Sequence, residues 1–289
     1  MRTNIKKYSI LCIILVCLSF SFGFLHNARS NFTNHISVLK TNQQSGIYDL
    51  PFSYFLKNGT CMYSMSDLYY FIHDRPVDII SIHKLVDPFS TDLDRINLIP
   101  LFNKASSRWE GVLMLSAGID GKMNYEYTLK DTIFIDEYKS LDLFYNSVND
   151  LSLDEDFNPF DLLWGKKDLL ISYNDCRESF KKSGSFGGVK DLDSLIVKLD
   201  ARLRAKKPIM LNRIYTVELP SNSIAWENDT LVGELKNGYI VSFQFYDNLE
   251  IESFKRAGER RLVCKMAEFD GERKKVKFIM CMNPDYTDL

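Results

Sequence analysis

The chain is poor in the residue types that build most catalytic centres. Only four histidines occur among the 289 residues, with neither an H-E-x-x-H zinc motif nor a G-x-S-x-G nucleophile motif. The six cysteines include no C-x-x-C pair, so the sequence lacks the common zinc-ribbon and thioredoxin-type patterns. We therefore expect a non-enzymatic protein. The alternative is a hydrolase that would gather Asp120, Asp131 and a histidine in one pocket.

An excess of charge of either sign is also lacking. Lys and Arg number 36 against 38 Asp and Glu, a net charge of −2. Basic residues do recur in 255–261 and 273–275, but this is common on the solvated face of a hairpin. The composition thus argues against nucleic acid as a partner.

The longest uncharged stretch lies near the N-terminus, at residues 8–25, after three basic residues. A membrane anchor needs about 17–25 apolar residues, and a cleavable signal needs small residues before the cut, which Ser21 and Gly23 would supply. Residues 1–25 therefore form a signal peptide or a membrane anchor. Basic residues before the run place the rest of the chain outside the cytoplasm, either anchored in the membrane or secreted to the periplasm.

Four cysteines follow this stretch and would meet an oxidising compartment. Cys264 and Cys281 lie symmetrically about a turn at 270–275, so a simple hairpin register would place them opposite each other. A disulfide between them is geometrically possible. The alternative is that both are small buried residues.

The most specific segment of the chain is 108–122, in which an apolar strand runs into a glycine-bracketed turn. Residues 111–117 are apolar on both alternating faces, which predicts a strand buried on both sides. Gly118 and Gly121 then allow positive φ on either side of Asp120, so this carboxylate should lie at a sheet edge. Four further elements are expected in this half of the chain: a helix at 64–74 and strands at 96–102, 132–136 and 168–173.

The order of short helix, Asp-Pro-Phe turn, strand and LMLSAGIDGK resembles the globular domain of type II secretion major pseudopilins, over about 64–173. In that family a DPW-type turn and an S-x-G-x-D-G loop occupy the same relative places, and the loop binds calcium. The resemblance implies calcium at Asp120, with Asp131 or Asp168 as the closing carboxylate. The family's peptidase glycine and the following glutamate have no counterpart around the apolar run, so filament assembly is not implied.

The second half begins after a Gly/Ser-rich segment, 182–190, which we interpret as a linker. A helix is expected at 191–206, followed by five strands with hairpin turns at 237–238 and 270–271 and a short helical or loop segment between the third and the fourth strand. The expected strands are 214–219, 230–235, 239–246, 262–269 and 276–282. This pattern resembles an OB-fold barrel of the anticodon-binding-like type over about 191–282.

The sequence as a whole predicts an α+β protein of the bacterial cell envelope, acting as a structural or binding module. The expected divisions are 1–25 signal or anchor, 26–63 spacer, 64–181 pseudopilin-like domain, 182–190 linker and 191–289 OB-like barrel. The expected partner is another envelope protein or a glycan. An alternative is an oligosaccharide- or peptide-binding barrel with an exposed aromatic groove that includes Tyr239 and Phe243.

Overall fold

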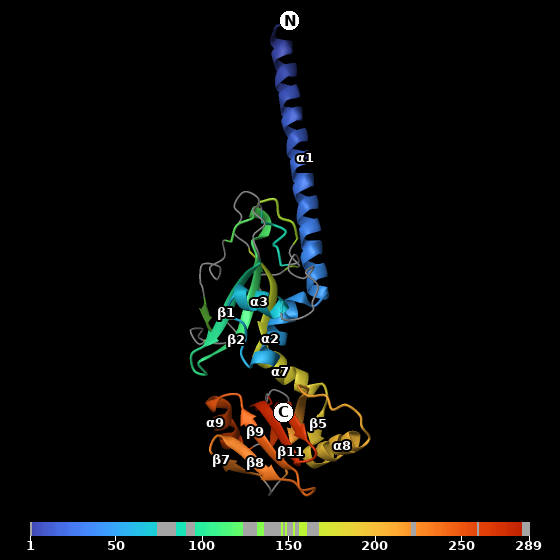
Figure 1. Ribbon diagram of the computed structural model, residues 1–289. Coiled ribbons are helices and arrows are strands. Elements are labelled where there is room, and N and C mark those ends of the chain that lie inside the picture. The colour runs from blue at the N-terminus through green and yellow to red at the C-terminus, as the bar shows by residue number, and fades with distance from the viewer. Residues whose placement is uncertain are drawn as a thin grey trace.

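The computed structural model describes residues 2–73, 85–90, 96–123, 132–135, 146, 148, 153, 156–160, 168–220, 224–258 and 260–284. It is an α+β molecule with one long N-terminal helix and two sheets of mixed orientation (Figure 1). The first sheet lies beside the C-terminal half of the long helix. The second forms a separate body at the end of the molecule farthest from the N-terminus.

The helix α1 (Arg2–Gln44) runs without interruption through the uncharged stretch and beyond it. Its apolar half is exposed, with Phe22 at 80%, whereas Phe32, Ile36 and Leu39 farther along are buried. Their spacing of four and then three residues places the three side chains on one face of the helix. The expected spacer at 26–63 is therefore wrong in its first part, because this segment continues the helix and contributes to the core.

Three short helices follow: η1 (Ile47–Asp49), α2 (Leu50–Asn58) and α3 (Met65–His73). The predicted helix at 64–74 is confirmed as α3, with Ser64 as its N-cap. The Ser64 hydroxyl accepts a hydrogen bond from Asp67 N at 3.2 Å and donates one to the Asp67 carboxylate at 2.9 Å. This reciprocal arrangement satisfies a backbone donor at the start of the helix.

The first sheet has the order β3-β1-β2-β4. Its strands are β1 (Asn97–Asn103), β2 (Arg108–Ser116), β3 (Ile133–Phe134) and β4 (Leu169–Asp175). β2 pairs antiparallel with both β1 and β4, and β3 runs parallel to β1. The expected burial of β2 on both faces is confirmed: Met114 packs with residues of α1, while Leu113 and Leu115 belong to a separate cluster.

One glycine of β2 is required by the closeness of the neighbouring strand. A Cβ atom at Gly111 would lie 2.6 Å from the carbonyl oxygen of Asn174 on β4. Such a contact is far too short, so a larger residue would separate the two strands. After β2, Gly118 and Gly121 both have φ of 68°, as the sequence predicted for this turn.

The helix α7 (Cys176–Ser185) connects the two sheets, and the side chain of Asp175 caps it by accepting from Glu178 N at 2.9 Å. The expected linker at 182–190 is therefore wrong in large part. Residues 182–185 belong to α7, and residues 189 and 190 belong to a strand. Gly184 is buried against Ile214, Thr216 and Val263, because the helix approaches the second sheet closely at this point.

The second sheet has the order β5-β6-β10-β11-β9-β8-β7. Its strands are β5 (Val189–Asp191), β6 (Ile214–Glu218), β7 (Ile224–Glu227), β8 (Thr230–Glu234), β9 (Ile240–Phe245), β10 (Arg261–Asp270) and β11 (Lys275–Met282). Two helices pack with it, α8 (Leu192–Arg204) and α9 (Asn248–Ala257). The predicted hairpins β8-β9 and β10-β11 are confirmed as antiparallel pairs. Over the described residues, the paired strands do not close into a barrel.

Candidate functional site

The residues expected to bind calcium are only partly brought together. Asp120 lies at the end of η2 (Gly118–Asp120), half-buried, and its carboxylate accepts from Lys122 N at 3.0 Å. Asp168 directly precedes β4 and is 1% exposed, whereas Asp131 lies outside the described residues. Within the described ranges, no group of three or more His, Cys, Asp or Glu side chains could hold a metal ion. The calcium site stays a prediction.

A different carboxylate organises the end of β2. Asp87, which is 1% exposed, accepts hydrogen bonds from Ser116 Oγ at 2.7 Å, Ala117 N at 2.6 Å and Phe89 N at 3.0 Å. A buried carboxylate needs such donors, because desolvation of an unpartnered charge is costly. The Asp-Pro-Phe segment was expected to form a turn, with no buried role for its aspartate. An Asp that begins such a turn was the available signal for this role.

The two aromatic residues expected in an exposed groove lie inside the second body. Tyr239 is 2% exposed, and its hydroxyl donates to the Asp200 carboxylate at 2.7 Å. Burial and this hydrogen bond raise the pKa of Tyr239 to about 12. Phe243 is fully buried and stacks on Phe278 with ring centroids 5.0 Å apart. Neither ring is available to a ligand, so an exposed aromatic groove at these positions is wrong.

The densest polar cluster lies where α7 passes between the two sheets, and it is centred on Arg177. Its guanidinium forms an ion pair with Glu110 of β2 at 3.1 Å and a second one with Glu250 of α9. Asp247, the N-cap of α9, lies 4.0 Å from the same guanidinium. Residues from both sheet bodies thus share one cation.

Each of the two glutamates has further partners that hold it in place. Glu110 accepts from Asn103 Nδ2 at 2.9 Å and from Ser106 Oγ at 2.7 Å. Glu250 accepts from the backbone N of Asn283 at 2.8 Å, beyond the end of β11. These hydrogen bonds offset part of the desolvation cost of the buried carboxylates.

The electrostatic environment keeps this cluster charged. Burial lowers the pKa of Arg177, but the attraction of Glu250, Glu110 and Asp247 more than offsets it, so the net pKa is raised. Burial also raises the pKa of nearby Tyr246, and the charge of Glu110 adds to the effect. Arg177 is therefore a cation and Tyr246 a neutral phenol at neutral pH.

A cavity of about 210 Å³ opens beside this cluster. Leu101 contributes to its apolar wall. Its described charged lining comes from Glu110, Asp175, Arg177, Glu178 and Lys181. Charges of both signs therefore line it. The cavity is a candidate for a small polar ligand, but Arg177 and Glu110 in its wall are already paired with each other, and Arg177 also pairs with Glu250 of the second body.

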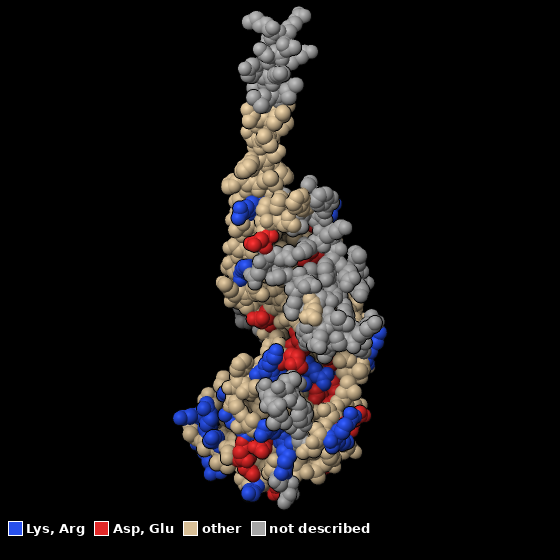
Figure 2. Space-filling model, turned by 180° about the vertical axis from the view of Figure 1, so that it is seen from behind, with Lys and Arg blue, Asp and Glu red and all other residues tan. Residues whose placement is uncertain are grey.

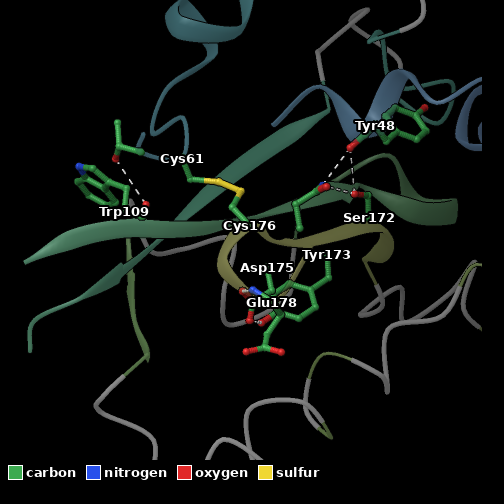
Figure 3. Close-up of a disulfide and its surroundings, with 10 residues drawn as sticks. Tyr48, Cys61, Trp109, Ser172, Tyr173, Asp175, Cys176 and Glu178 are labelled. Carbon is green, nitrogen blue, oxygen red and sulfur yellow. Dashed lines mark hydrogen bonds between the residues drawn. A yellow bond between two sulfur atoms is a disulfide. The ribbon is translucent and has the colours of Figure 1, made fainter. Parts of the chain in front are cut away.

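A disulfide at the junction links the segment after α2 to the start of α7 (Figure 3). No local signal in the sequence predicts this pair. Cys61, which follows α2, is bonded to Cys176 at the start of α7 across 115 residues. Cys61 N also donates to the carbonyl oxygen of Trp109 on β2 at 3.0 Å. Cys264 and Cys281 are both free and buried, so the disulfide considered between them is not formed.

Lys265 provides a further contact between the two bodies. It lies on β10, is 5% exposed, and its ammonium donates to the carbonyl oxygen of Leu56 in the last turn of α2. Burial lowers the pKa of this lysine. A cation at the C-terminal end of a helix also interacts favourably with the helix dipole.

Comparison with known proteins identifies no relatives. No protein-family model matches the chain, and no curated protein and no solved structure matches it either.

Proposed function

We propose that this chain is a non-enzymatic protein of the bacterial cell envelope that α1 holds in the membrane. The two sheet bodies would lie outside the cytoplasm and act as a structural or binding module. The observation that carries the proposal is the division of α1 into two halves. One half exposes large apolar side chains, and the other is part of the core of the first sheet body.

The length and composition of α1 support the anchor. Residues 13–44 form a helix with a mean hydropathy of 1.3 over its most apolar window, sufficient by length and composition to cross a membrane. Figure 2 shows neither acidic nor basic side chains on the visible face of the stalk between its grey tip and the body. The 18 uncharged residues of 8–25 would span about 27 Å as a helix, close to the thickness of a bilayer core.

The disulfide supports the same location. Disulfides persist in oxidising compartments and are rare in the cytoplasm. The Cys61–Cys176 disulfide lies in a buried cluster with Phe55, Phe180 and Tyr246, protected from reductants in solution.

The arrangement of α1 on the first sheet supports the pseudopilin-like part of the proposal. One half of α1 protrudes, and the other half packs against the small first sheet, as expected for a pseudopilin-like domain with an N-terminal helix. We do not extend the proposal to filament assembly, because the peptidase glycine and the following glutamate are missing.

The strand order of the second sheet supports an OB-like barrel. β6 and β7 lie near opposite ends of the sheet order, yet only residues 219–223 separate them in the chain. If β6 and β7 act as one bent strand, the five strands form a ring, with α9 between the third and the fourth. This is the Greek-key arrangement of a small, partly open barrel.

The anchor is tested on the full chain expressed in a bacterium. We expect it in the membrane pellet after an alkaline carbonate wash, with an intact N-terminus by mass spectrometry. Replacing Leu15 and Leu18 with Arg should release it or block its export, since each charge at the centre of a span costs about 2.5–3.5 kcal/mol. A soluble mature chain that begins after Gly23 would refute a retained anchor.

Calcium remains part of the proposal as a stabilising ligand near Asp120. We expect calcium to raise the unfolding midpoint of the full chain, by mass action on the folded state, and a chelator to reverse the effect. The Asp120→Asn variant should remove the response. An unchanged midpoint with and without a chelator would eliminate the calcium site.

A further inference from the structure

A cleft of about 530 Å³ lies between α1 and the segment 156–160. From α1 it is lined by Phe22, Leu25, His26 and Arg29. From the facing segment it is lined by Asp156, Phe157 and Pro159. Among its described lining residues, the cleft thus combines apolar side chains with the cationic Arg29 and the anionic Asp156.

The cleft lies where the uncharged run of α1 ends. The uncharged run of α1 ends at Leu25, and Arg29 is the first charged residue after it. If the run fills the hydrocarbon core, Phe22 and Leu25 lie at its edge and Arg29 lies about 6 Å beyond, one helical turn farther. This is the depth of the phospholipid headgroups.

The segment that faces α1 is held by contacts inside the body. Phe157 packs against Phe32 of α1 with ring centroids 5.8 Å apart. The side chain of Asn158 accepts from Phe160 N at 3.1 Å, which fixes a tight turn. The Phe160 side chain is nevertheless 59% exposed. Exposed aromatic rings are common among residues that insert into a membrane interface.

From these features we propose that the cleft binds the headgroup of a zwitterionic aminophospholipid from the membrane that α1 spans. Arg29 would bind the phosphate, since a guanidinium matches its oxygens with paired donors. Asp156 would bind the ammonium group. Phe22 and Leu25 would contact the first methylenes of the acyl chains.

The volume and the chemistry of the cleft agree with this ligand. Small-molecule sites have volumes of about 300–1,000 Å³ and combine apolar walls with a few placed polar groups. A purely anionic headgroup would leave Asp156 facing a like charge. A headgroup whose ammonium is fully methylated could not donate a hydrogen bond to this carboxylate.

The inference depends on the proposed function, because a chain without its anchor would not hold the cleft at the membrane. The test uses the full chain, purified in detergent with equal amounts of phosphatidylethanolamine, phosphatidylcholine and phosphatidylglycerol. Native mass spectrometry then measures which lipids stay bound. We expect phosphatidylethanolamine to be retained at least about tenfold over the other two, which corresponds to about 1.4 kcal/mol.

Two substitutions locate the bound lipid. Arg29→Glu should abolish retention, and Asp156→Asn should keep a bound lipid but remove the preference for phosphatidylethanolamine. The matched control is Arg256→Glu, on an arginine of α9 whose side chain is 82% exposed, and it should retain lipid like the parent chain. If both cleft variants retain lipid with the parent's preference, the inference is overturned.

The outcomes separate this inference from the proposed function. A chain that resists the carbonate wash but shows no lipid preference refutes the cleft alone. A mature chain that begins after Gly23 lacks Phe22 and refutes both the anchor and the cleft.

A Phe160→Trp variant adds an independent measurement, because lipids brominated near the headgroup should quench its added fluorescence. Quenching no greater than that of the parent chain would contradict insertion of this segment.

Discussion

The two sheet bodies form their cores in different ways. The core of the second body comes almost entirely from one continuous part of the chain, from Leu192 to Cys281. The core of the first body gathers residues from Phe32 of α1 to Ile171 of β4, including η1, α3 and the segment around Phe89. Closing such long loops costs conformational entropy. The first body should therefore depend more strongly on covalent and helical supports than the second.

A further cluster of buried apolar residues joins the two bodies. Phe55 of α2 and Phe180 of α7 pack with Tyr246, Val263 and Met282 from the second body. The Arg177 ion pairs and the Lys265 contact lie at the same junction. The second body thus builds its core from its own continuous part of the chain, while the first is held from two sides, by α1 and by this junction.

Removing the disulfide should have the largest effect and should widen the difference between the bodies. A Cys61→Ser variant frees a loop of 115 residues, for which the chain-entropy estimate is about 5 kcal/mol. We expect hydrogen exchange in the full chain to increase strongly in β2 and β4, and much less in β8 and β9. The control is Cys17→Ser, since Cys17 is free and exposed. Equal loss of protection in both sheets would show that the bodies unfold as one unit.

Breaking the central ion pair should affect both bodies together. Arg177→Met leaves Glu110 and Glu250 buried without their cation, which costs about 3–5 kcal/mol. Urea unfolding of the full chain measures the loss. Adding Glu250→Gln to this variant should recover part of it, because one uncompensated charge is removed.

The surface pair Arg204–Asp200 is the matched control for this test. Its N–O distance is 2.6 Å, but the Arg204 side chain is 80% exposed. Arg204→Met should therefore cost less than about 1 kcal/mol. A similar cost for Arg177→Met and Arg204→Met would mean that the junction does not depend on its ions.

A pair of neighbouring residues tests whether α1 belongs to the core of the first body. Leu39 is fully buried, and Leu39→Ala should cost about 2–5 kcal/mol through lost burial and the cavity left behind. Val38 is 47% exposed, and Val38→Ala should change stability by less than about 0.5 kcal/mol. Unfolding midpoints of the two variants give the comparison. Equal midpoints would show that this part of α1 is only loosely attached.

Local signals in the sequence predicted much of the fold. The alternation in β2, the glycines at 118 and 121, and the Asp-Gly and Asn-Gly hairpins each act within a few residues. These elements appear in the structure where the sequence predicts them. The N-terminal uncharged run predicted a signal or an anchor, and the structure has a helix there that is long and apolar enough to cross a membrane.

The features of the candidate site were not predictable because they join distant residues. Arg177, Glu110 and Glu250 come from three elements of two bodies, and nothing in their spacing indicates that they meet. The Cys61–Cys176 disulfide has the same origin, since four cysteines outside the apolar run allow three pairings. The linker expected at 182–190 failed because Gly184 serves close packing, although a glycine-rich segment usually indicates flexibility.

The smallest expected effect concerns Tyr239, whose hydroxyl lies inside the second body. Because the folded protein raises the pKa of this tyrosine to about 12, above its usual value near 10, the folded state holds the phenolic proton more strongly. Its stabilising contribution is complete below about pH 10 and is lost as the pH rises towards 12. Tyr239→Phe should cost about 1.5–3 kcal/mol at neutral pH, the value of one hydrogen bond to a carboxylate, here that of Asp200. Unfolding midpoints between pH 8 and about 11 should fall less steeply in Tyr239→Phe than in the parent chain. Parallel curves would mean that the buried hydroxyl does not couple the second body to pH.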